Sequence, residues 1–92
     1  MKRFIIERNV PGMGANDQAG FCDAATISNA AIKKLAPKVQ WVTSYVVANG
    51  TYCIYLAEDE ALIHQHAQIS GFPASTVTEI SRTIDPTTAA RR

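Results

Sequence analysis

The chain has 92 residues, of which 47% are hydrophobic and 18% are charged, and its formal net charge is +1. This length allows a single small domain, residues 1–92, and the composition is that of a globular protein rather than of a disordered chain. A charge so close to neutral offers no broad basic surface, so we expect no nucleic-acid partner. No apolar run approaches the roughly 20 residues that a membrane helix needs, and no signal peptide is evident. We therefore expect no membrane partner and a cytoplasmic location.

The first half of the chain predicts a strand followed by a helix. Residues 2–10 alternate between apolar and polar side chains, which is typical of a half-buried strand. Residues 17–35 carry apolar side chains at helical spacing and end just before Pro37. Asn16 or Asp17 is expected to cap this helix, because a short polar side chain can accept the unpaired N–H groups of the first turn.

A β-hairpin is predicted next. Residues 39–48 and 51–57 are rich in β-branched and aromatic side chains, and Asn49-Gly50 separates them. An Asn-Gly pair favours a two-residue type I′ turn, in which both central residues have positive φ. With that turn, Tyr45 would pair with Ile54.

The last third of the chain predicts a second helix and a final strand. Asp59 can cap a helix that runs through about Ile69 and ends at Gly71. Residues 76–84 form the last predicted strand, and residues 87–92 are expected to be a loose tail.

The resulting order, β-α-β-β-α-β, predicts an α+β protein of the ferredoxin-like class. In this fold a four-stranded antiparallel sheet carries both helices on one face. The pattern also leaves room for a short extra C-terminal strand.

The predicted hairpin has two largely apolar faces, although the two helices can cover only one of them. An antiparallel sheet that is open on one side should carry polar residues there. We therefore expect a second copy of the chain to cover the face that bears Trp41, Tyr45 and Tyr52, which makes the protein a homodimer. The alternative is that helix ends and the C-terminal tail cover this face within one chain.

The two histidines are separated by one residue on a predicted helix, so their side chains point about 200° apart. His66 falls on the apolar stripe of that helix, where its ring is either a hydrogen-bonded part of the core or the floor of a pocket. If they face the helices, Glu7, Cys53 and Tyr55 would be its neighbours in such a pocket.

His64 lies on the polar side of the same helix, four residues after Glu60. Side chains at this spacing meet on a helix surface, and an imidazole with a carboxylate suits a divalent transition metal. The candidate metal ligands are thus Glu60, His64 and His66, and the alternative for the outer pair is an ordinary solvated surface.

No motif of covalent or nucleotide chemistry is present. Cys22 and Cys53 have neither zinc-site nor redox spacing, and both are expected to be reduced and buried. Ser28 and Ser44 lack recognisable triad partners, and no phosphate-binding glycine motif occurs. We therefore assign no catalytic residue.

A group of short motifs runs along nearly the whole chain. They are Phe4-Ile5-Ile6-Glu7-Arg8, Pro11-Gly12, Val39-Gln40-Trp41-Val42, Ser44-Tyr45-Val46, Tyr52-Cys53-Ile54-Tyr55, His66-Ala67, Gly71-Phe72-Pro73-Ala74 and Ile84-Asp85-Pro86-Thr87-Thr88. With these motifs the chain resembles a family of small bacterial proteins of unassigned function, whose members are often labelled nickel-binding proteins. The resemblance implies a ferredoxin-like dimer that binds nickel or another divalent metal, with no haem, flavin or nucleotide.

Two functions follow as expectations. The first is a non-enzymatic homodimer that binds nickel for sequestration or sensing. The alternative is a dimeric α/β-barrel enzyme that binds a small molecule, similar to cofactor-free monooxygenases or isomerases and using His66 in a pocket between helix and sheet. A deep pocket with an acidic group beside His66 would favour the alternative.

Overall fold

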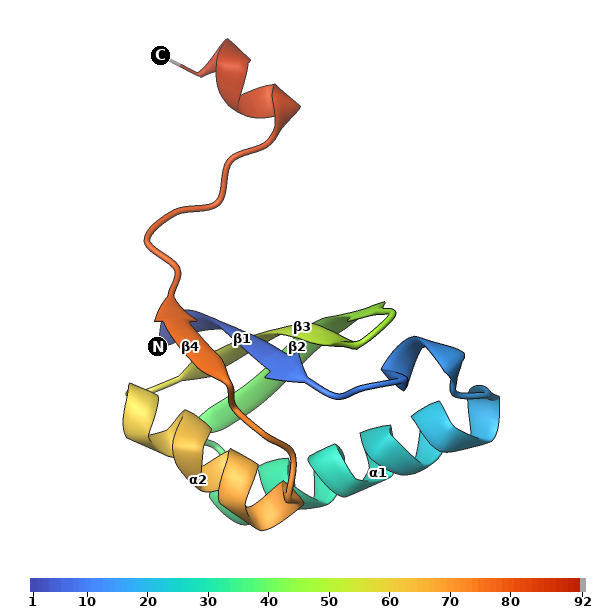
Figure 1. Cartoon of the computed structure of the whole chain (residues 1–92). Coiled ribbons are helices and arrows are strands. Elements are labelled where there is room, and N and C mark those ends of the chain that lie inside the picture. Colours follow the sequence, from blue (N-terminus) through green and yellow to red (C-terminus); the bar gives the residue numbers. More distant parts are fainter. Residues whose placement is uncertain (92) are drawn as a thin grey trace.

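The computed structural model describes residues 1–91 and shows the predicted order of elements (Figure 1). The four strands form one antiparallel sheet in the order β2-β3-β1-β4, and both helices lie against the same face of it. This arrangement confirms the ferredoxin-like fold. The elements are β1 (Lys2–Asn9), η1 (Met13–Ala15), α1 (Gln18–Leu35), β2 (Val39–Val47), β3 (Gly50–Ala57), α2 (Glu60–Ser70), β4 (Thr76–Glu79) and η2 (Pro86–Ala90), where η marks a 3₁₀ helix.

Both helices begin and end where the local sequence predicts. The Asp17 carboxylate accepts from the Gly20 amide at 2.9 Å and caps α1, and the Asp59 carboxylate accepts from the Leu62 amide at 3.1 Å and caps α2. Gly71 follows α2 in the left-handed conformation, with φ of 79°. These ends depend on contacts within a few residues, so the sequence alone was enough to place them.

The predicted hairpin register is wrong. Tyr45 pairs with Tyr52 rather than with Ile54, and the connection is Ala48-Asn49 rather than Asn49-Gly50. Gly50 is the first residue of β3 and does not have positive φ. A Cβ atom at Gly50 would lie 2.1 Å from the Arg8 carbonyl oxygen. Glycine is therefore needed here because two strands approach closely, and not because of a tight turn.

A β-bulge in β2 moves Trp41 to the opposite face of the sheet from that predicted. The pairing shifts between Trp41 and Thr43, so that Trp41 pairs with Tyr55 and Thr43 pairs with Ile54. Tyr55 faces the helices, and Trp41 therefore lies on the helix side with it. Because a bulge inserts one extra residue into a strand, it reverses the alternation that the sequence pattern assumes.

The end of the chain also differs from the prediction. β4 stops at Glu79, after which the Ile80 amide donates to the Arg3 carbonyl at 2.8 Å. β1 starts at Lys2, so little of that strand remains beyond Arg3 to pair with a longer β4. Within the segment expected to be a loose tail lies part of η2, which is closed by a capping box between Asp85 and Thr88. Residue 92 of that tail lies outside the described residues.

Residues 81–91 form an exposed arm that leaves the body of the domain. In Figure 1 the arm, drawn in orange and red, runs away from the sheet on the side opposite the two helices. Ile84, on this arm, is 70% exposed. The radius of gyration is 14.2 Å, compared with about 12 Å for a compact domain of this length, which reflects the arm.

The outer face of the sheet, turned away from the helices, carries Tyr45, Val47 and Tyr52. All three are exposed, Tyr45 by 62%. The opposite face packs against the helices and contains most of the core, formed by Phe4, Ile6, Val39, Cys53, Tyr55, Ala57, Leu62 and Ile63. Within residues 1–91, neither helix has the length and apolar character needed to span a membrane.

Candidate functional site

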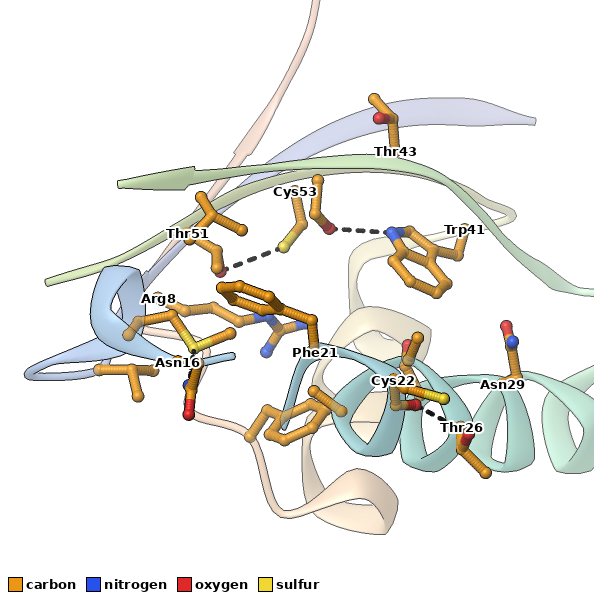
Figure 2. Close-up of a pocket in the computed structure, with 18 of the residues that line it drawn as sticks. Arg8, Asn16, Phe21, Cys22, Thr26, Asn29, Trp41, Thr43, Thr51 and Cys53 are labelled. Carbon is orange, nitrogen blue, oxygen red and sulfur yellow. Dashed lines mark hydrogen bonds between the residues drawn. The ribbon is translucent and has the colours of Figure 1, made fainter. Parts of the chain in front are cut away.

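A cavity of about 970 Å³ lies between the sheet and α1. Figure 2 shows it from the side, with α1 below and β-strands above, and with Trp41 extending from the sheet toward the helix. Its walls come from five elements, β1, η1, α1, β2 and β3, and from three loops. The side chains that give the cavity its chemical character are those of Arg8, Phe21, Ser28, Trp41, Cys53 and Tyr55.

Arg8 brings a charge into this cavity although it is only 4% exposed. Its Nη1 donates to the Pro73 carbonyl at 2.7 Å, and its Cζ lies 5.8 Å from the centre of the Tyr55 ring. Its Nη2 is buried and has no hydrogen-bond partner within residues 1–91. Buried polar groups are almost always paired in folded proteins, so this nitrogen marks a position where a further group is expected.

A chain of hydrogen bonds runs from the cavity wall into the core. The Ser28 Oγ lies 3.2 Å from the Tyr55 hydroxyl and 3.2 Å from His66 Nε2. The Tyr55 and His66 rings meet edge to face, with centres 5.0 Å apart. His66 is fully buried, and its Nδ1 lacks a partner in the described part of the chain. Ser28 and Tyr55 thus connect the cavity with the histidine.

Burial keeps both rings neutral. Loss of solvent, together with the positive charge of Arg8, lowers the pKa of His66 from 6.5 to about 4. Burial raises the pKa of Tyr55, against the opposing effects of Ser28 and Arg8. Near neutral pH, the guanidinium of Arg8 is therefore the charged group at this end of the cavity.

The predicted pocket residues are placed only partly as expected. Cys53 and Tyr55 face the helices and line the cavity, whereas His66 lies behind the wall and reaches it through Ser28. Glu7 lies on the outer face, where it accepts a hydrogen bond from the Tyr52 hydroxyl at 3.3 Å. Glu7 is therefore not a neighbour of His66, because adjacent residues of a strand point to opposite faces.

Two important residues of the cavity were not predicted. Arg8 continues the alternation of the buried Phe4 and Ile6, so strand periodicity carried a signal for its position. Ser28 belongs to the apolar stripe of α1, and a polar residue within such a stripe is a signal for a buried hydrogen bond. No local signal, however, indicates that these residues meet.

The candidate metal residues fall into two separate places. His64 Nε2 lies 3.2 Å from Glu60 Oε2 on the exposed side of α2, as predicted, while His66 points into the core. Within residues 1–91 no group of three or more His, Cys, Asp or Glu side chains is placed to hold a metal ion together. The Glu60–His64 pair offers two donor groups on one helix surface, and His66 does not join it.

The cysteines are both free thiols, but they are not both buried. Cys53 lies in the core and its Sγ donates to Thr51 Oγ1 at 3.3 Å. Cys22 is exposed on α1, so the expectation that it is buried is wrong. Its side chain borders the cavity rather than filling the space beneath the sheet (Figure 2).

Comparison with known proteins identifies the relatives of this chain. The family model described as "Nickel responsive protein SCO4226-like" matches residues 4–80, which confirms the resemblance drawn from the motifs. The crystal structure of SCO4226 from Streptomyces coelicolor A3(2) is similar to the chain, with a TM-score of 0.74 and 14% sequence identity. That similarity covers 89% of this chain and 99% of the other, and at this identity it shows a shared fold. No curated protein matches the chain.

Proposed function

Since the chain belongs to the SCO4226-like family of nickel responsive proteins, we propose that it is a homodimer that binds divalent nickel through Glu60 and His64. The observation that carries the proposal is the 3.2 Å contact between His64 Nε2 and Glu60 Oε2 on an exposed helix surface. Imidazole and carboxylate are donors that nickel accepts, and an i,i+4 pair can hold both on one ion. Water molecules would complete the coordination, because both side chains are open to solvent.

His66 is not a ligand in this proposal. Its ring is buried beside the positive charge of Arg8, which disfavours a divalent cation there. Its Nε2 is also engaged with Ser28. The proposed ion therefore lies on the solvent side of α2 and does not touch the core.

The homodimer is proposed to form through the outer face of the sheet. Tyr45, Val47 and Tyr52 leave an apolar surface there, and the exposed arm projects on the same side (Figure 1). A second copy of the chain would cover both features by one symmetric contact, since a two-fold interface uses the same surface twice. Trp41 is not part of this surface.

Calorimetric titration with nickel chloride near neutral pH tests the metal proposal. We expect binding to the wild-type chain and loss of binding in His64→Ala, with weakening in Glu60→Gln. His66→Gln is the matched control, because it removes an imidazole from the same helix without touching the proposed site. Binding that survives His64→Ala, or that is lost in His66→Gln while the fold is intact, would contradict the assignment.

A second candidate function is the binding of a small molecule in the cavity between α1 and the sheet. The specific observation in its favour is that Arg8, whose buried Nη2 has no partner within residues 1–91, is one of the residues that line a 970 Å³ cavity. The polar groups connected with His66 here are Ser28, Tyr55 and Arg8, and no acidic side chain hydrogen-bonds to His66 among the described residues. This arrangement supports a binding role for the cavity more than acid–base chemistry.

A further inference from the structure

The environment of Arg8 lacks the counter-charge that a buried guanidinium normally has. Arg8 forms no salt bridge within residues 1–91, and Glu7, its neighbour in β1, points to the outer face. Burial of an unpaired charge is unfavourable unless another group compensates it. The Pro73 carbonyl accepts a hydrogen bond from Nη1, and the Tyr55 ring lies on one side of the guanidinium. Nη2 is left without a hydrogen-bond partner within residues 1–91.

The cavity that Arg8 lines is otherwise mainly apolar and aromatic. Phe21 rises from α1 and Trp41 extends from β2, so that aromatic side chains approach the cavity from opposite layers (Figure 2). The indole N–H of Trp41 is already donated to Ser44 Oγ at 2.9 Å. Trp41 therefore offers its apolar ring surface to the cavity and no free donor.

From these observations we propose that the cavity binds a small organic carboxylate, whose charged group pairs with the guanidinium of Arg8 and whose apolar body lies between Phe21 and Trp41. This inference rests on the second candidate function and names its ligand class. A guanidinium matches the geometry and charge of a carboxylate, and a cavity of 970 Å³ is within the range of small-molecule sites. The Tyr55 hydroxyl and Ser28 Oγ provide further polar groups at the same wall.

The features of this site distinguish the carboxylate from other ligands. A polyphosphate would need several cations or a glycine-rich loop, whereas Arg8 is the cationic residue among those lining the cavity within residues 1–91. A metal cation would be repelled by the guanidinium. A neutral ligand would leave the buried charge without a partner.

The test uses 2-naphthoate as the probe and the neutral 2-naphthamide as its matched control. The chain has one tryptophan, so in ¹⁵N-labelled protein a single indole N–H signal reports on Trp41. We expect 2-naphthoate to shift this signal in the wild-type chain and to bind about tenfold to a hundredfold more tightly than 2-naphthamide, because a charged hydrogen bond is at stake. Arg8→Gln should remove that preference, and Arg8→Lys should retain part of it.

The outcomes separate this inference from the function on which it rests. Equal binding of the two probes to the wild-type chain would overturn the carboxylate assignment but leave a small-molecule cavity. No shift of the indole signal with either probe at millimolar concentration would overturn both. The comparison of the two probes in the wild-type chain decides the matter even if Arg8→Gln does not fold. The His64→Ala variant should bind 2-naphthoate as the wild type does, because the proposed nickel site is separate from the cavity.

Discussion

At the scale of single residues, His66 couples the stability of the fold to pH. Its ring is fully buried, and its pKa lies at about 4 because burial and the Arg8 charge disfavour the imidazolium. In the unfolded chain a histidine has a pKa of about 6.5. The unfolded chain therefore takes up a proton at this position at a higher pH than the folded chain does.

We predict that the free energy of unfolding decreases as the pH falls from about 6.5 to about 4. Above that window His66 takes nothing from the free energy of unfolding, because its ring is neutral in both the folded and the unfolded chain. At the lower end of the window, protonation of the unfolded chain at His66 reduces the free energy of unfolding by up to about 3 kcal/mol. Urea denaturation at several pH values measures it, with His66→Gln as the comparison because glutamine keeps one hydrogen bond and does not titrate. The same pH slope in the wild type and in His66→Gln would show that the histidine is not the cause.

Arg8 shows how one residue can belong to both the fold and the candidate site. Its position in β1 follows from the alternation that also buries Phe4 and Ile6. Packing alone, however, does not explain why this buried residue is charged. Within residues 1–91 its side chain donates a hydrogen bond to the Pro73 carbonyl, which is a neutral group. A buried charge with an unpartnered nitrogen is thus the residue-level feature that points to a ligand.

At the scale of elements, two glycines serve different physical purposes. Gly50 lies where β3 passes close to the Arg8 carbonyl oxygen, whereas Gly71 has positive φ and open space within 4 Å of the point that a Cβ atom would occupy. The first position excludes a side chain for lack of space, and the second disfavours one through backbone conformation alone.

We predict that Gly50→Ala costs about 3 kcal/mol of unfolding free energy or more, because two backbones must separate. Gly71→Ala should cost only about 1–2 kcal/mol, the penalty of the left-handed conformation for alanine. Chemical denaturation of both variants provides the comparison. Equal costs would mean that β3 can shift to relieve the contact with Arg8.

At the scale of the whole molecule, the outer face and the arm remain uncovered in one chain. The sheet has its helices on one side, and Tyr45 and Tyr52 form a cross-strand pair on the other. Exposed apolar and aromatic side chains that gather on one face often mark an interface in a folded protein. The homodimer proposed above would bury it.

We predict that Tyr45→Ser combined with Tyr52→Ser converts the dimer to a monomer without unfolding it, as measured by light scattering. Trp41→Ser is the informative contrast, because Trp41 lies beneath the sheet and its loss should lower stability rather than change the mass of the assembly. A wild-type chain that is monomeric at micromolar concentration would remove the proposal.

The order of elements, the helix caps and the candidate pair Glu60–His64 were all evident in the sequence. Each depends on residues close together in the chain: a cap reaches three residues ahead, and an i,i+4 pair spans one helical turn. Hydrophobic periodicity then limited the fold to the ferredoxin-like arrangement, because two helices and four strands in this order have few compact solutions.

The hairpin register, the face of Trp41 and the composition of the cavity were decided only in the folded chain. The contact of Gly50 with Arg8 links residues more than 40 positions apart, and the bulge near Trp41 reverses a face without changing the local pattern. Arg8, Ser28 and Tyr55 likewise come from three different elements and meet only when the sheet has formed on α1. The sequence by itself therefore determined the elements and the fold class, which follow from local conformational preferences. Tertiary packing determined the candidate ligand site, because its geometry arises from contacts that no short segment encodes.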